Sequence, residues 1–276
     1  MDDEETIRQI RENIIADHND LARPQILDLA TRSTDRPMTL LTCASLFLTL
    51  GDEDGFQSVL KTISSNLPSD SDLLCEIAAG LIALDVPRDA FEALRNAGDS
   101  GKAVRHRAAA LQALLKHQDA LATIDSVSDR TDDDLVLRAQ ILSSLKRHDE
   151  ALSVLKPMVD AGYYPACRAY VAALLKAGLE KDAQKYVRTR AKDKTADGLA
   201  LMAQYQWITG NETAAGAYAS KAIKVDEKHT GAMEFLGYSL AVKGAVREAK
   251  IVAGALNERD TGNAAAFRII VLCRGK

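Results

Sequence analysis

Hydrophobic residues recur along almost the whole chain at spacings of three and four, which place them on one face of a helix. Ile7, Ile10, Ile14 and Ile15 show this spacing within a predicted helix over residues 6–16. A half-buried strand would instead alternate apolar and polar residues, and no sustained alternation occurs in the sequence. The pattern therefore predicts an all-α chain.

The first 36 residues are predicted to form two helices without the small residues that recur later. Pro24 is expected in the first turn of the second helix, where a residue without an N–H is tolerated, and Ile26, Leu27 and Ala30 follow it. Terminal units of repeat arrays are usually atypical because one of their faces meets water. We therefore expect residues 1–36 to be an N-terminal cap or a degenerate repeat.

From residue 37 onward, small residues pair at a spacing of twelve. Two antiparallel helices approach closely only where small side chains face each other, so each pair predicts a helix crossing. The predicted crossing pairs are Cys43 and Gly55, Ala78 and Ala90, Ala108 and Ala120, Ala139 and Ala151, Val171 and Ala183, Ala203 and Ala215, and Gly237 and Ala249. The second members lie 35, 30, 31, 32, 32 and 34 residues apart (90 − 55, 120 − 90 and so on). Only Val171 is bulkier than expected, and the period predicts seven helical pairs over residues 37–259.

Turn residues separate the helices of each predicted pair. Glycines that could adopt a left-handed conformation stand where four of the first helices should end: Gly51, Gly178, Gly210 and Gly244. Residues 85–87 and 146–148 occupy this turn in pairs that lack the glycine. Thr131 and the acidic residues after it predict a capped helix start. The array is therefore expected to be one continuous solenoid.

A final helix is predicted over residues 264–273, within a C-terminal capping segment at 260–276. Its apolar residues cover nearly all sides: Phe267, Ile270 and Val271 on one face, and Ile269, Leu272 and Cys273 on another. One hypothesis is that one face covers the last repeat and the other binds a partner or forms a homodimer, with Phe267, Ile269 and Leu272 as contact residues. The alternative is that its own chain buries the helix completely.

The composition is that of an ordinary folded protein, with 47% hydrophobic and 27% charged residues. The formal net charge of −4 gives no basic footprint for nucleic acid. The acidic residues 2–5 do not resemble a secretory signal, and the longest apolar run, residues 39–50, is too short to span a bilayer. We therefore expect a cytoplasmic protein. Its four dispersed cysteines are predicted to be reduced.

No motif of catalysis, phosphate binding or metal binding is present in the sequence. The five histidines are scattered and are interpreted as surface or turn residues. The acidic run Asp132–Asp134 is explained by a helix start. We therefore predict no catalytic residue, no metal and no cofactor.

The last two repeats resemble the tetratricopeptide repeat (TPR) family. Leu236 and Gly237 match the family's Leu-Gly pair, and Ala249 matches its second-helix alanine. The family's closing proline is Glu227 here, and its early tryptophan is Met233 in the last repeat. The earlier repeats are degenerate. The resemblance implies a right-handed superhelix whose first helices line a concave groove that binds peptide or protein.

The resemblance also implies which side chains face that groove: Val136, Gln140, Arg168, Ala172, Ala200 and Gln204. This set lacks the Lys, Asn and Arg clamp of the family's chaperone-binding members. Trp207 is expected to face the groove beside Gln204, with Tyr238 as its neighbour and Arg168 one repeat earlier. Aromatic and Arg side chains are common binding hot spots. We therefore predict that Arg168, Gln204, Trp207 and Tyr238 contact a partner. The alternative for Trp207 is a place in the core between helices.

The expected function is a non-catalytic protein-interaction scaffold or adaptor, either transient or as a subunit of a larger complex. Two alternatives stay open. Residues 158–165 resemble the inter-repeat link of pentatricopeptide proteins, which bind single-stranded RNA. An enzyme could also assemble a site from scattered carboxylates in the groove.

Overall fold

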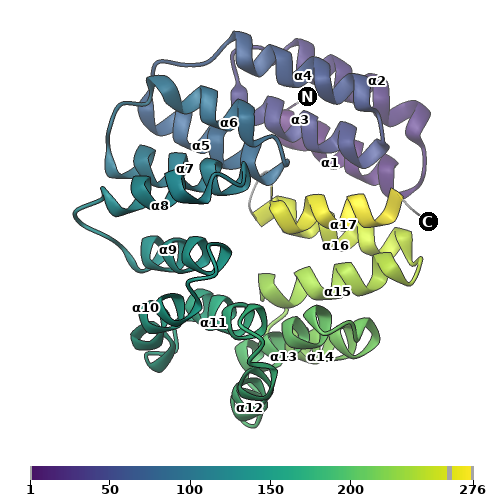
Figure 1. The fold of residues 1–276 in the computed structure, drawn as a ribbon. Coiled ribbons are helices and arrows are strands. Elements are labelled where there is room, and N and C mark those ends of the chain that lie inside the picture. The colour runs from purple at the N-terminus through teal and green to yellow at the C-terminus, as the bar shows by residue number, and fades with distance from the viewer. Residues whose placement is uncertain (1, 260–262, 275–276) are drawn as a thin grey trace. The chain divides into compact units, whose positions relative to one another are not determined.

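The computed structural model describes residues 2–259 and 263–274, and every regular element within these ranges is helical (Figure 1). The helices are α1 (Asp3–Ile15), α2 (Asn19–Thr31), α3 (Pro37–Leu50), α4 (Glu53–Ser65), α5 (Ser71–Ala83), α6 (Pro87–Ala93), η1 (Leu94–Asn96), α7 (Gly101–Ala113), α8 (His117–Asp125), α9 (Asp132–Ser144), α10 (His148–Asp160), α11 (Tyr164–Lys176), α12 (Glu180–Ala191), α13 (Ala196–Ile208), α14 (Glu212–Val225), α15 (Thr230–Val242), α16 (Val246–Arg259) and α17 (Ala264–Arg274). The prediction of an all-α chain is confirmed.

The crossing residues predicted from the sequence lie on consecutive helices, which we number as pair 1 (α3 and α4) to pair 7 (α15 and α16). Every one of these residues is buried, including the bulkier Val171. Gly55 shows why a small side chain is needed, because an added Cβ would lie 2.5 Å from the ring of Phe47. In pairs 1 to 6 the two helices pack against each other, and the residues that the spacing predicts are buried in them.

Left-handed residues lie in the turns after the first helices, as predicted. The φ angles of Gly51, Gly178, Gly210 and Gly244 are 77°, 75°, 82° and 79°. Where the turn lacks glycine, Asp85, Leu115 and Lys146 adopt the same conformation, with φ of 61°, 60° and 63°. This conformation is strained for residues with a side chain, so these three turns are imposed by the packing of the helices that they join.

The capped start of α9 is also confirmed. The Thr131 hydroxyl accepts a hydrogen bond from the Asp134 backbone N–H, and the Asp134 carboxylate accepts one from the Thr131 N–H. This reciprocal arrangement satisfies two N–H groups that a helix start leaves unpaired. Asp134 also forms an ion pair with Arg105 on α7, which links pairs 3 and 4.

The expected place of Pro24 is wrong. Helix α2 begins at Asn19, so Pro24 lies in its second turn rather than its first. The backbone N–H of Ala22 already donates to the His18 carbonyl at 3.0 Å, and the Ala22 side chain is fully buried. The helix therefore begins before the start that the proline suggested, and its first turn contains the buried Ala22.

The chain divides into two compact units. The central unit contains residues 99–239, and the terminal unit combines residues 1–98 with residues 240–276. In the terminal unit α16 packs against α1, and α17 packs against α16, α3 and α5. The predicted division into a cap, an array and a C-terminal helix follows repeat order and stays a prediction.

Candidate functional site

A cavity of about 520 Å³ opens in the central unit. Each residue that lines it belongs to the first helix of a pair, and five successive pairs contribute. The lining residues are Gln112 on α7, Val136 and Gln140 on α9, Tyr164, Pro165, Arg168, Ala169, Ala172 and Lys176 on α11, Gln204 on α13, and Thr230 on α15. We call it the first-helix cavity.

Five of the six residues expected to face a groove line this cavity: Val136, Gln140, Arg168, Ala172 and Gln204. The sixth, Ala200, is fully buried and packs in a core cluster with Leu199, Ala222 and Ala232. The repeat position thus places side chains on the same side of successive first helices. In pair 6, Gln204 lines the cavity, whereas Ala200 packs in the core.

Arg168 lies at the centre of a polar network. Its Nη2 donates to the Glu234 Oε2 at 2.7 Å, and its guanidinium carbon lies 5.5 Å from the centre of the Phe235 ring. Burial alone would lower the pKa of Arg168, but Glu234 together with Tyr164 and Tyr238 offsets this and holds the pKa above its ordinary value. The side chain remains 31% exposed. The charge is therefore fixed in place with part of its surface accessible.

Gln204 is held against the same residue but leaves one atom unpaired. Its Nε2 donates to the Arg168 carbonyl oxygen at 3.0 Å, which fixes the amide orientation because a carbonyl only accepts. The opposite atom, Oε1, is buried without a hydrogen-bond partner, although Gln204 is only 6% exposed. Buried unpaired acceptors are uncommon in folded proteins, so this atom is an exception among the buried polar groups of the central unit.

Tyr164 and His229 form a second cluster beside the cavity, which sequence reasoning missed. Their rings meet edge to face with centroids 4.9 Å apart. The His229 Nε2 lies 2.9 Å from the Asp197 Oδ1, and its Nδ1 accepts from the Ala232 N–H at 3.0 Å, so this histidine caps α15. From the sequence, His229 was interpreted only as a surface or turn residue.

The Tyr164 hydroxyl is buried and has no hydrogen-bond partner. Burial raises the pKa of Tyr164 above its ordinary value, so the group stays protonated. A Cβ added at Gly231 would lie 2.3 Å from this oxygen, so only glycine at position 231 leaves room for the ring. A second unpaired polar atom thus lies on a residue that lines the cavity.

Trp207 and Tyr238 are neighbours, with ring centroids 5.2 Å apart. The Tyr238 hydroxyl donates to the Glu234 Oε1 at 3.0 Å, so all four predicted groove residues belong to one cluster around Arg168 and Glu234. Neither aromatic residue lines the cavity. Tyr238 is only 4% exposed, whereas Trp207 is partly exposed. Their contact with a partner stays a prediction.

The three predicted contact residues of the C-terminal helix differ in exposure. Ile269 is fully buried within the terminal unit, while Phe267 and Leu272 are partly exposed. A homodimer through this helix stays a prediction, and the side chains available to it are Phe267 and Leu272.

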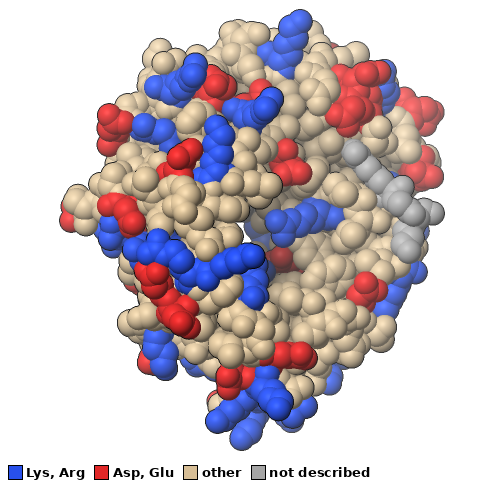
Figure 2. All heavy atoms as spheres, viewed as in Figure 1, with Lys and Arg blue, Asp and Glu red and all other residues tan. Residues whose placement is uncertain are grey.

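The lining of the cavity includes two cations, Arg168 and Lys176, and no carboxylate. On the face shown in Figure 2, Lys and Arg side chains are interspersed with Asp and Glu. Among the described residues, no group of three or more His, Cys, Asp or Glu side chains could hold a metal ion. No described helix is both long and apolar enough to cross a membrane.

No protein-family model matches the chain, and no curated protein matches its sequence. Solved structures of TPR proteins are similar to it. One is a TPR protein from Parabacteroides merdae, with 13% identity, a TM-score of 0.49, and coverage of 86% of this chain and 98% of that one. Another is MamA from Desulfovibrio magneticus RS-1, with 16% identity, a TM-score of 0.29, and coverage of 76% and 98%.

Proposed function

We propose that this protein is a non-catalytic interaction scaffold that binds an extended segment of a protein partner in the first-helix cavity. The observation that carries this proposal is a cavity lined only by first helices, on which Tyr164 and Gln204 hold polar atoms without partners. The proposal keeps the cytoplasmic location that the sequence predicts.

The chemistry of the lining suits a peptide backbone. Gln112, Gln140 and Gln204 come from three different first helices, and each amide can both donate and accept. Adjacent helices pack about 8–10 Å apart. Three steps from α7 to α13 therefore cover about 24–30 Å, which an extended segment of roughly eight residues spans at about 3.3 Å per residue.

The lining of the cavity has few free cations for binding RNA phosphates. A nucleic-acid groove neutralises several phosphates with free cations. Here Arg168 is already paired with Glu234, and Lys176 is the other cation of the lining. A protein segment is therefore the occupant that the lining supports.

The test fills the cavity. Ala172→Trp places an indole in the lining, and Ala217→Trp places one on the exposed side of α14 as a matched control. Each folded full-length variant is used as bait in nuclease-treated extract of the source cells, and captured proteins are quantified by mass spectrometry. We expect Ala172→Trp to lose partners that Ala217→Trp keeps.

Partners that bind both variants equally would contradict binding in this cavity. Capture that disappears with nuclease in the unchanged protein would favour the RNA alternative.

A further inference from the structure

We infer that one face of α12 is a docking surface for an acidic segment of a protein partner. The face carries four cations, Lys181, Lys185, Arg188 and Lys192, which we call the α12 stripe. The inference goes beyond the proposed function, because the residues that line the first-helix cavity include none of α12.

The side chains of the α12 stripe lie along one line of the helix. Their spacing is i, i+4, i+7, i+11, which places them within about 60° of the circumference and along about 16 Å of the axis. Lys192 follows the last residue of α12 but keeps helical backbone angles, with φ of −59° and ψ of −41°. All four residues are exposed. Figure 2 shows Lys and Arg side chains gathered at the bottom of the view, where Figure 1 places α12.

The cations of the stripe have no carboxylate partner within the chain. None of the four forms an ion pair with another residue that the structure describes. Elsewhere in the central unit, Arg105 and Arg168 are paired with carboxylates. The acidic residues of α12, Glu180 and Asp182, lie about 90° or more from the centre of the stripe. Glu180 accepts a hydrogen bond from the Tyr205 hydroxyl instead.

The stability of α12 does not explain this arrangement. Like charges four residues apart destabilise a helix, and the stripe contains two such pairs, Lys181 with Lys185 and Arg188 with Lys192. Lys181 also lies in the first turn, where the helix dipole disfavours a cation. A bound anionic segment would offset both effects.

The neighbouring repeats have no cationic stripe at these positions. Counted from the crossing residue Ala183, the stripe occupies positions −2, +2, +5 and +9 (181 − 183, 185 − 183 and so on). On α10, counted from Ala151, these positions are Asp149, Ser153, Lys156 and Asp160, and Lys156 pairs with Asp160. On α14, counted from Ala215, they are Thr213, Ala217, Ser220 and Lys224. The fold therefore does not require four cations here.

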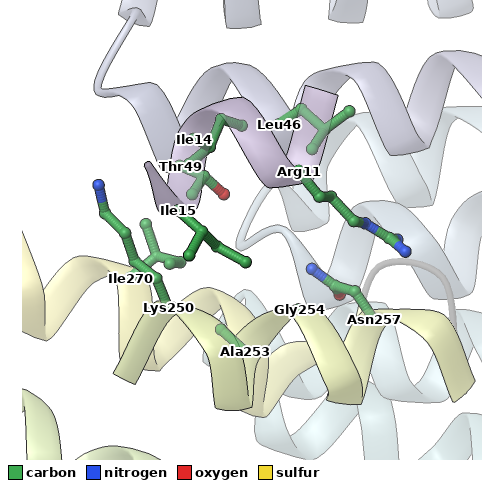
Figure 3. A pocket seen from close by; sticks show the side chains of 10 residues that line it. All are labelled: Arg11, Ile14, Ile15, Leu46, Thr49, Lys250, Ala253, Gly254, Asn257 and Ile270. Atoms are coloured by element: carbon green, nitrogen blue, oxygen red, sulfur yellow. The ribbon is translucent and has the colours of Figure 1, made fainter. Parts of the chain in front are cut away.

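Helix α16 shows what can pack on this side of a second helix. Its positions +5 and +9 are Gly254 and Glu258 (254 − 249 and 258 − 249). Gly254 lines a small cavity together with Ile14 of α1 (Figure 3), and Glu258 forms an ion pair with Arg11 of α1 at 3.2 Å. Another segment thus covers this side of α16 and pairs with position +9 by charge. On α12, which packs against α11 and α13, position +9 is the cation Lys192, so the matching group is a carboxylate.

An acidic protein segment fits the stripe better than a nucleic acid or a membrane. Nucleic-acid-binding domains are usually basic as a whole, whereas this chain has a formal net charge of −4. Helices that bind at a membrane surface combine cations with an exposed apolar face, but the stripe is flanked by Gln184 and Thr189. About six extended residues span 16 Å at about 3.3 Å per residue. A segment of this length rich in Asp and Glu would match the four cations.

The experiment measures binding of fluorescein-labelled octaglutamate to the full-length chain by fluorescence anisotropy. Octaglutamine is the neutral control peptide, and ionic strength is kept low because salt screens exposed charges. The test variant combines Lys185→Gln and Arg188→Gln. The matched control combines Lys116→Gln and Lys146→Gln, which removes two other exposed cations without an ion pair to a described residue. We expect the test variant to bind octaglutamate about tenfold more weakly, because two exposed ion pairs are lost, and the control to bind as the unchanged chain does.

Equal losses in the two variants, or octaglutamate binding no tighter than octaglutamine, would overturn the inference. Tighter binding to an eight-nucleotide oligouridine or to phosphatidylserine vesicles would also overturn it, because the stripe would then recognise phosphates. The Ala172→Trp variant should bind octaglutamate as the unchanged chain does, which separates this outcome from that of the proposed function. A loss in Ala172→Trp would place the acidic segment in the first-helix cavity and overturn the inference.

Discussion

The two compact units use the same repeat positions for opposite purposes. In the central unit half of these positions in pairs 4 to 6 carry polar side chains, namely Gln140, Arg168 and Gln204, and these three line a cavity. In the terminal unit the corresponding Leu40 and Ala44 are apolar and buried, and α17 packs against α3, the helix that carries them. The comparison shows that the helical repeat determines which side chains face inward, while their chemistry determines whether the space is open or filled.

The largest effect is expected when a charged side chain of the central unit is introduced at the equivalent buried position of the terminal unit. Leu40→Arg gives pair 1 the residue of pair 5 at a position that is 1% exposed. We expect the free energy of unfolding to fall by about 3–5 kcal/mol, because a buried charge would lack a partner. Urea unfolding followed by circular dichroism measures this loss. Leu40→Met, which nearly conserves volume, should lose less than about 1.5 kcal/mol, and equal losses would contradict the charge argument.

The reverse exchange, Arg168→Leu, should have a smaller effect. It leaves Glu234, whose side chain is 13% exposed, without its ion pair, although Tyr238 still donates to this carboxylate. We expect a loss of about 2 kcal/mol, typical of a hydrogen bond to a charged group. Adding Glu234→Gln should restore part of the stability in a double-mutant cycle. Strictly additive losses would show that the two residues are not coupled.

Helix starts provide a third comparison. Helix α9 of the central unit has a capping box, whereas α3 of the terminal unit begins at Pro37 without a side-chain cap. Thr131→Ala should therefore lower the free energy of unfolding by about 1 kcal/mol, and Thr131→Ser should change it little. A stability that is unchanged in Thr131→Ala would mean that packing, as in α3, determines where α9 begins.

The smallest effect concerns alkaline pH. Burial raises the pKa of Cys43 in the terminal unit from its ordinary value of 9.0 to about 12. Above pH 9 the unfolded chain ionises this thiol while the folded chain does not, so stability falls as pH rises. We expect Cys43 to contribute a loss of about 1 kcal/mol between pH 8.5 and 10. Thermal unfolding of Cys43→Ala should show a correspondingly weaker pH dependence, and an identical dependence would contradict the prediction.

Local features of the fold could be predicted from the sequence because they depend on neighbours along the chain. The crossing residues and the turn at Gly210 follow from spacing and backbone freedom within one repeat. The start of α2 was misplaced because Pro24 is compatible with more than one turn of a helix. Helix α2 in fact begins at Asn19, and its first turn contains the buried Ala22.

The site was predicted only in part, because its missing members depend on contacts between distant residues. The inward position of Arg168 followed from the repeat, but its partner Glu234 lies 66 residues later. The packing of Tyr164 against His229 likewise joins two different pairs. Helix α17 packs against α3, which lies more than 200 residues earlier in the sequence. The neighbouring helix α16 also contacts α3, through a hydrogen bond from Asn257 to Ser45. A one-dimensional pattern contains no signal for such partners.

The composition of the terminal unit has a consequence for synthesis on the ribosome. In an ordinary array each repeat needs only its neighbours, but pairs 1 and 2 wait for α16 and α17. The intervening stretch is about 140 residues long (240 − 98 = 142), which takes roughly 7–30 s to translate at about 5–20 residues per second. During that time the central unit can complete its own core, while α3 and α5 expose the apolar side that α17 will cover. Residues 1–98 thus finish folding only after residues 240–276 have been made.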